Sequence, residues 1–230
     1  MDKFAVRGRH IRLPPAQSSL PPTSPAATAQ RVWPCARQLA EWLSASREAP
    51  SLEGRAVLEL GAGCGLSGLA AWLAGARQVC LTELAENVTR LEEVVACNQA
   101  GSAVTVAALD WTQPLPAAIS AARWDLIVAA DCVFWPELFS PLLGTIRALI
   151  ESSEQQGATP RVILSMTDRA GRLQAFKDTA QSAGYSLQPL VPLESARPLP
   201  AKSLEAMRRA SCELFELVVF SDATSSLHVL

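Results

Sequence analysis

A chain of 230 residues has room for one α/β domain with short additions at its ends, and its 49% hydrophobic residues can supply a continuous core. The formal net charge of −2 gives no general attraction to polyphosphate, so nucleic acid is not expected as a partner. One local basic run is read as ordinary solvated surface: Arg197, Lys202, Arg208 and Arg209.

The cysteines and histidines disfavour several classes of site. The six cysteines are scattered, without a CxxC pair or a nearby histidine, so neither a metal centre nor a disulfide framework is predicted: Cys35, Cys64, Cys80, Cys97, Cys132 and Cys212. The two histidines, His10 and His228, lie near the termini, which disfavours a histidine-centred active site. No apolar signal-peptide core opens the chain, and its longest apolar helical stretch is too short for a bilayer. We therefore expect a soluble, cytoplasmic protein with no membrane partner.

The N-terminal region, residues 1–30, is predicted to hold short strands and a proline-rich connector. FAVRGRHIRL can form one or two strands, and residues 14–28 (PPAQSSLPPTSPAAT) should be extended. The segment WPCARQLAEWLSASRE then places Trp33, Leu39 and Trp42 at helical spacing, with Pro34 suited to a first turn. Residues 31–220 are expected to form the main domain, and residues 221–230 a loose tail.

Apolar runs and helical patterns alternate from residue 55 onward, which favours a mostly parallel sheet with helices on both faces. Helices are expected over CGLSGLAAWLAG, over PELFSPLLGTIRALIES and over AGRLQAFKDTAQSAG. A further helix is expected to follow RQVCLTE and to run through about Gln99. The predicted strands are RAVLELG, RQVCLTE, AVTVAALD, WDLIVAAD, RVILSMTD and, last, CELFELVVF.

The first of these strands runs into the strongest motif, VLELGAGCGLSG. Gly61 permits a tight turn, and Gly63 and Gly65 lack side chains where a ligand must lie against the backbone. The following helix begins at the carboxyl ends of the strands, where open α/β sheets bind ligands. A turn that serves only tight strand–helix packing is the alternative interpretation.

Two acidic residues accompany this turn. Glu83 ends the second strand about twenty residues further on, where a carboxylate can accept hydrogen bonds from both ribose hydroxyls. Ordinary surface or capping use of Glu83 is the alternative interpretation. Glu59, two positions before the first glycine, suits a cationic amino acid group better than a pyrophosphate.

Gly63, Gly65 and Gly68 also spell GxGxxG, so a nicotinamide dehydrogenase is a rival interpretation. Against it, the chain has no second domain for a hydride acceptor. Its main domain also offers no histidine, and only one tyrosine, Tyr185, as a proton relay. Together with Glu59, these observations favour methyl transfer.

With ELGAGCG in place, the chain resembles the class I, or seven-strand, S-adenosylmethionine-dependent methyltransferases. Three further segments, RVWPCARQLAEWL, ALDW and AADCVF, resemble motifs of the protein lysine methyltransferases that modify chaperones, elongation factors and calmodulin. The resemblance spans residues 4–220 and is strongest to the members that modify elongation factor 2. It implies a Rossmann-like, mostly parallel seven-strand sheet with helices on both faces and an antiparallel last strand.

The resemblance also implies roles for particular residues. The helix segment carrying Trp33 would close over the methionine part of the cofactor. Asp110 would accept from the adenine amino group, and Trp111 would lie against the adenine ring. Ala130, with Ala129 before it, would offer backbone beside the sulfonium. Both tryptophans have plain core packing as their alternative role.

Asp131 is the main candidate for the reaction centre, because the strand WDLIVAA aims it at the mouth of the crevice. Its carboxylate can orient an incoming lysine amine, and Phe134 can wall the channel for the apolar stem. Phe134 stands where many family members have tyrosine, so a role that needs a phenol hydroxyl is absent. The alternative is that Asp131 caps the helix that starts near Pro136.

The expected function is therefore transfer of a methyl group from S-adenosylmethionine to a lysine of a protein substrate, an elongation factor or a similar protein, by a monomer. A small-molecule or nucleic-acid methyltransferase is an alternative, although the loop DCVF lacks the paired prolines typical of enzymes that act on a flipped base. A non-catalytic S-adenosylmethionine-binding partner protein is a third possibility.

Overall fold

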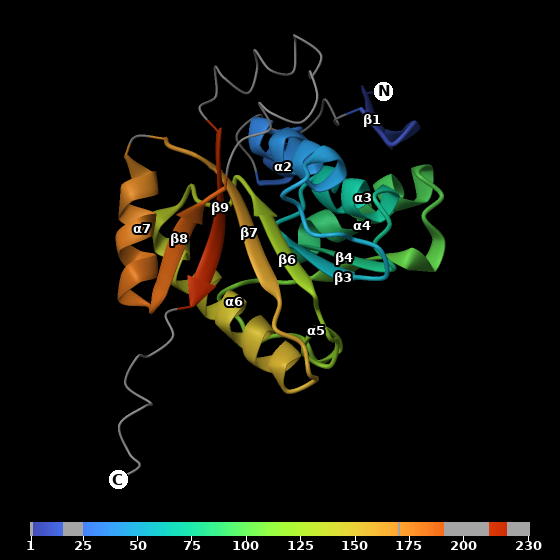
Figure 1. The fold of residues 1–230 in the computed structure, drawn as a ribbon. Helices are drawn as coiled ribbons and strands as arrows, with labels where there is room; N and C mark the ends of the chain where they lie inside the picture. Colours follow the sequence, from blue (N-terminus) through green and yellow to red (C-terminus); the bar gives the residue numbers. More distant parts are fainter. Residues whose placement is uncertain (1, 16–24, 170, 191–211, 220–230) are drawn as a thin grey trace.

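The computed structural model of the chain describes residues 2–15, 25–169, 171–190 and 212–219. The basic run at 197–209, His228 and the expected tail at 221–230 lie outside these residues. Within them, a two-stranded sheet and a seven-stranded sheet form the framework (Figure 1).

The small sheet is an antiparallel hairpin of β1 (Asp2–Val6) and β2 (Arg9–Leu13), which confirms the predicted N-terminal strands. Helix α1 (Pro25–Ala29) then follows, so the prediction that all of residues 14–28 are extended was wrong at its end. The sequence PAATA contains three alanines, which favour a helix, and Pro25 is tolerated in its first turn. Helix α2 (Pro34–Ala45) begins after Trp33, as its pattern predicted.

The strands of the large sheet lie in the order β5-β4-β3-β6-β7-β9-β8. Strand pairs from β5 to β7 are parallel, and β9 runs antiparallel to both β7 and β8. The expected fold class, with its antiparallel last strand, is therefore confirmed. The strands are β3 (Ala56–Leu60), β4 (Gln78–Glu83), β5 (Val104–Ala108), β6 (Leu126–Ala130), β7 (Arg161–Thr167), β8 (Tyr185–Pro189) and β9 (Cys212–Val219).

Sequence patterns missed β8. Its five residues, YSLQP, follow directly on Gly184, and only Tyr185 at its start is buried. Because its alternation of apolar and polar residues covers only Tyr185 to Gln188 and it ends in proline, its assignment depends on pairing with β9 rather than on local propensity.

Helices cover both faces of the sheet, as expected, and Figure 1 shows α2 and α3 on one face and α5 and α6 on the other. The connecting helices are α3 (Leu66–Leu73), α4 (Ala85–Cys97), α5 (Ala117–Ser120), α6 (Phe139–Glu154) and α7 (Arg172–Ser182), with short 3₁₀ turns η1 (Gly101–Ala103) and η2 (Pro136–Leu138). No helix within the described residues is both long and apolar enough to cross a membrane.

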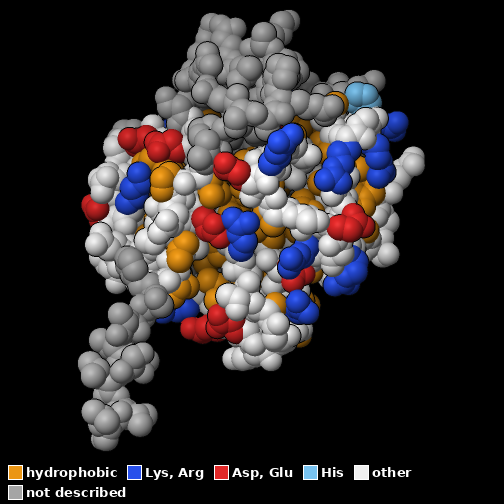
Figure 2. Space-filling model, viewed as in Figure 1, with side chains coloured by type: hydrophobic (Ala, Val, Ile, Leu, Met, Phe, Trp, Pro, Cys, Tyr) orange, Lys and Arg blue, Asp and Glu red, His pale blue; other side chains and the backbone are white. Residues whose placement is uncertain are grey.

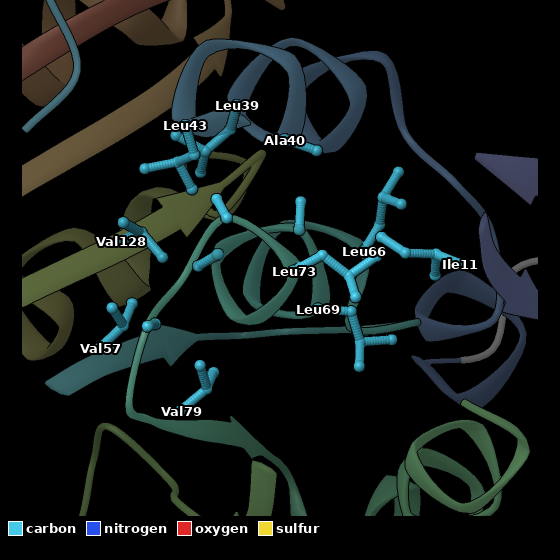
Figure 3. Packing of buried hydrophobic residues seen from close by; sticks show 14 of the residues in the cluster. Ile11, Leu39, Ala40, Leu43, Val57, Leu66, Leu69, Leu73, Val79 and Val128 are labelled. Atoms are coloured by element: carbon cyan, nitrogen blue, oxygen red, sulfur yellow. The ribbon is translucent and has the colours of Figure 1, made fainter. Parts of the chain in front are cut away.

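The buried apolar side chains form one cluster on each face of the sheet. Figure 3 shows the first, in which Leu39 and Leu43 of α2 lie over α3 while Val57 and Val79 of the strands lie beneath it. Ile11 of β2 contributes from the far side of α3, and Arg12 and Asn98 exchange hydrogen bonds of 2.8 and 2.9 Å that attach the hairpin to the end of α4. This packing fixes the carboxyl end of β3, where the glycine turn begins.

Candidate active site

The chain order of the sheet reverses at β3, which pairs with β4 on one side and with β6 on the other. In an open parallel sheet, loops that leave the carboxyl ends of two such strands separate toward opposite faces and leave a crevice between them. The glycine turn follows β3, and Asp131 follows β6. The predicted site residues therefore come from the loops around this one point.

The glycine turn has no room for side chains. Gly61, Gly63 and Gly65 have φ angles of 59°, 55° and 72°, a region that side chains rarely adopt. A Cβ atom on Gly61 would stand 2.9 Å from the Cys132 sulfur and 3.3 Å from an indole carbon of Trp111. One on Gly63 would stand 3.1 Å from the carbonyl oxygen of Ala29. Segments after β5 and β6 thus lie directly against the bare backbone of the turn.

Glu83, at the end of β4, reaches the same turn. Its carboxylate accepts a hydrogen bond from the Gly63 N–H at 3.3 Å, and others from the Leu84 N–H at 2.6 Å and the Asn87 amide at 3.0 Å. The acid predicted to bind a ribose is therefore held beside the second glycine by three donors. Its place next to the turn agrees with the spacing argument, and its ligand remains a prediction.

Glu59 lies under the turn and is only 1% exposed. Its carboxylate accepts the Gly68 N–H of α3 at 2.8 Å, and its backbone carbonyl accepts the Thr82 hydroxyl at 2.7 Å. Burial raises the pKa of the Glu59 carboxyl to about 7, and the hydrogen bond from Gly68 opposes this shift. In the structure this side chain joins β3 to α3, and its predicted contact with a cationic group stays a prediction.

Asp110 and Trp111 differ in where they point. The Asp110 carboxylate is exposed and accepts the backbone N–H and the hydroxyl of Thr112 at 2.9 and 2.7 Å, which lowers its pKa. Trp111 is partly buried, its indole lies against Gly61, and its carbonyl accepts the Thr145 hydroxyl at 3.4 Å. The structure thus brings Trp111 onto the turn, whereas Asp110 stabilises its own loop.

Asp131 adopts a left-handed backbone conformation, with φ of 58°. Its N–H donates to the Ser165 carbonyl at 2.8 Å, which holds this conformation at the end of β6, one residue after Ala130. A non-glycine residue in this region carries backbone strain, and such residues concentrate at functional sites. The alternative role as a helix cap is not seen, because η2 precedes α6 and the N-cap of α6 is Leu138 without a side-chain bond.

The side chain of Asp131 is 8% exposed and forms an ion pair with Arg169. The Arg169 guanidinium lies 4.8 Å from the ring centre of Trp33 and 5.8 Å from that of Phe134. Burial raises the pKa of the Asp131 carboxyl, while Arg169 and a hydrogen bond with the Cys35 thiol oppose the rise. Three predicted residues, Trp33, Asp131 and Phe134, therefore meet around one cation.

Two thiols lie beneath this group. The Cys35 sulfur stands 3.4 Å from the Cys212 sulfur and 3.0 Å from the Thr167 hydroxyl, at the contact of α2, β7 and β9. Beside them, the Gln38 amide donates to the Cys212 carbonyl at 3.0 Å and accepts the Ser165 hydroxyl at 2.7 Å. These bonds attach the start of α2, and with it Trp33, to the carboxyl edge of the sheet.

Sequence reasoning missed Arg169, Arg172 and the contact of α1 with the turn. A signal existed for Arg169, because it follows the strand RVILSMTD and so comes to the same sheet edge as Asp131. A hollow lined by Gly63 together with Ala29 and Asn87 was also not predicted. Nowhere in the residues that the structure describes do three or more His, Cys, Asp or Glu side chains gather as a metal site requires.

The fold is that of known methyltransferases. The CcbJ methyltransferase of Streptomyces caelestis superposes with a TM-score of 0.57 at 14% identity, covering 84% of this chain and 92% of that one. A family model described as lysine methyltransferase matches residues 23–182. The chain therefore belongs to the lysine methyltransferase family, as its motifs predicted.

Two curated human relatives are named as methyltransferases that act on proteins. The protein-lysine N-methyltransferase EEF2KMT is 35% identical over 151 residues, which are 60% of this chain and 44% of that protein. The histone-arginine methyltransferase METTL23 is 35% identical over 127 residues, or 53% of this chain and 64% of that protein. The chain thus spans about half the length of the curated relatives it matches.

Proposed function

We propose that the chain is an S-adenosylmethionine-dependent protein methyltransferase that acts on a lysine side chain. The observation that supports this most is the environment of Asp131. Its backbone is strained, its side chain is buried, and it is paired with the Arg169 guanidinium, which lies over the rings of Trp33 and Phe134. Membership of the lysine methyltransferase family supports the same reaction.

The residue types at the glycine turn suit the cofactor that this activity needs. Gly61 and Gly63 present bare backbone at φ angles suited to glycine, and a Cβ on either would meet an atom at 2.9 or 3.1 Å. Glu83, beside them, can accept the two ribose hydroxyls, and the indole of Trp111 offers an apolar face at the same turn. S-adenosylmethionine, when bound, supplies an activated methyl group.

The residues of the chain would then capture and align the nucleophile. Asp131 would hold the incoming amine by a charge-assisted hydrogen bond, with the rings of Trp33 and Phe134 beside it. A lysine with a solution pKa of about 10.4 must lose a proton, which costs about 4 to 5 kcal/mol at neutral pH. Desolvation lowers this cost, whereas the Asp131 carboxylate raises it, so we assign Asp131 to positioning rather than to proton removal.

A protein substrate fits the surface next to this group. Trp135 is 54% exposed and makes an edge-to-face contact with Phe134, their ring centres 4.8 Å apart. A large exposed aromatic ring beside the reaction centre is typical of a protein contact. The similarity to EEF2KMT makes an elongation factor the first substrate to test. The similarity to METTL23, which is named a histone-arginine methyltransferase, makes an arginine side chain a second candidate.

The proposal also includes a cytoplasmic monomer without a nucleic-acid partner. In support, the six cysteines do not have the spacing of a disulfide framework, as is usual for proteins of a reducing compartment. On the face that Figure 2 shows, basic and acidic side chains are interspersed rather than gathered in a basic stripe. Size-exclusion chromatography with light scattering and localisation of the tagged chain test these two points.

The activity is tested by incubating the protein with methyl-labelled cofactor and a cell lysate, then identifying the labelled residue by mass spectrometry. Methyl-lysine on a protein supports the proposal, methyl-arginine favours the second candidate, and labelled RNA or metabolite contradicts both. Binding of S-adenosylhomocysteine without any transfer would indicate a non-catalytic partner protein.

Asp131→Asn should abolish labelling and largely spare binding of S-adenosylhomocysteine in calorimetry. The control is Asp178→Asn, which changes an exposed carboxylate on α7 and should leave both measurements unchanged. Loss of cofactor binding in the Asp131 variant would contradict the positioning role.

A further inference from the structure

Arg169 follows β7 at the same edge of the sheet as Asp131, and its guanidinium lies at the proposed reaction centre. Its guanidinium donates to Asp131 Oδ2 and lies over the rings of Trp33 and Phe134. The three partners come from the start of α2 and from the loop after β6, so segments far apart in the sequence converge on this one cation.

The environment of this guanidinium has the chemistry that a substrate amine needs. A cation held between aromatic faces, with a carboxylate at its end, gains from ring electrostatics and from a charge-assisted hydrogen bond. The Asp131 side chain is 8% exposed and that of Arg169 is 30% exposed, so the pair is largely screened from water. A second cation at the same carboxylate would be repelled by the first at close range.

We propose that Arg169 occupies the position of the substrate's cationic side chain, and that an alkylammonium group such as that of lysine must displace it to reach Asp131. This inference rests on the proposed function and adds a specificity-determining residue to it. Arg169 thus competes with the substrate amine for Asp131. Amines that bind weakly do not displace it, whereas the side chain of a docked protein does.

The side chains around Arg169 have supporting contacts of their own. Arg172 donates to the Phe134 carbonyl at 2.8 Å, and its guanidinium lies 4.6 Å from the centre of the Phe134 ring. Trp33 donates through its indole N–H to the Thr28 carbonyl at 3.1 Å, and the backbone N–H of Asp131 is bonded to Ser165. Removal of the Arg169 side chain should therefore leave both rings and the carboxylate in place.

The test is binding of n-butylammonium, which copies the stem and charge of lysine, to the full chain. Arg169→Ala and Arg169→Gln should bind it about tenfold more tightly than the wild type in NMR or calorimetric titration. The double variant Arg169→Ala/Asp131→Asn should lose this gain, because the carboxylate is then absent. If both single variants bind n-butylammonium no more tightly than the wild type, Arg169 does not occupy the position of the amine.

Arg123→Ala serves as the matched control, because Arg123 pairs with Asp125 just before β6, at the opposite end of the strand that leads to Asp131. It should leave the affinity for n-butylammonium unchanged. S-adenosylhomocysteine is titrated in parallel. If the wild type fails to bind it, the proposed function fails, whereas the n-butylammonium titrations still decide whether Arg169 fills a cation site.

Discussion

Replacement of Gly68 by alanine tests whether the glycine motif sets the distance between α3 and the sheet. Gly68 lies in α3, is buried, and does not need a positive φ. A Cβ there would stand 2.2 Å from a methyl carbon of Leu81, 2.8 Å from a carboxylate oxygen of Glu59 and 3.1 Å from a methyl carbon of Val79. Because Leu81 and Val79 are fully buried, these atoms have little space into which to move.

The magnitude follows from two opposing effects. A contact of 2.2 Å places the cost of overpacking in the upper part of its usual range, about 2 to 3 kcal/mol, and alanine gains about 1 kcal/mol over glycine inside a helix. We expect the Gly68→Ala protein to lose about 1 to 2 kcal/mol of unfolding free energy. In a chain of this size, the loss lowers the melting temperature by about 2 to 8 °C.

Gly144→Ala is the matched control, because Gly144 also lies inside a helix, α6, but is exposed and has no atom within 4 Å of its Cβ position. It should gain up to about 1 kcal/mol, so the two variants should differ by about 1 to 3 kcal/mol. Urea unfolding followed by circular dichroism measures both. If the Gly68→Ala protein resists urea as well as the wild type, the close contact does not constrain α3.

Three other predictions concern the crevice and its surroundings. Gly61→Ala should weaken binding of S-adenosylhomocysteine at least about tenfold in calorimetry, because the new methyl group strains the turn and meets side chains behind it; unchanged affinity would refute the bare-backbone site. Glu59 has a pKa raised from 4.5 to about 7, so its contribution to stability is present below pH 4.5 and is lost as the pH rises to about 7. Urea titrations at several pH values measure this fall in the free energy of unfolding, and Glu59→Gln should make it smaller by about 3 kcal/mol. An unaltered pH profile would show that burial of the Glu59 charge costs little. Hydrogen peroxide should oxidise the Cys35 and Cys212 thiols to a disulfide and be reduced to water, because the two sulfur atoms lie 3.4 Å apart. Peptide mapping without reductant would detect the bond, and two persistently free thiols would disprove the contact.

The sequence predicted most of the fold because its signals are local. An apolar strand followed by alternate glycines and a helix identifies β3 and α3, and the acid at the end of β4 follows at the expected spacing. Strand β8 was missed because its pairing with β9 depends on residues far along the chain. The same limitation applies to α1, whose contact with Gly63 has no local signature.

The candidate site was predictable only in part for a related reason. The sheet edge at which Asp131 lies follows from its place after a buried strand. The ion pair with Arg169 and the rings around it depend on side-chain directions in loops, which periodicity does not encode. For Asp110 the spacing was informative about the loop, yet the carboxylate turns toward Thr112 in the structure.

The position of β9 between β7 and β8 has a consequence for the order in which the sheet forms during synthesis. Strand β8 pairs only with β9 among the described strands, and β9 is made after it. While residues 212–219 are still within the ribosome, β7 is therefore an open edge and β8 has no partner strand. When β9 emerges, Arg161 of β7 can bind Glu216 through two nitrogen–oxygen contacts of 2.7 and 2.8 Å, which set the register of the final strand. A nascent chain halted before this point would expose an edge prone to pairing with other chains.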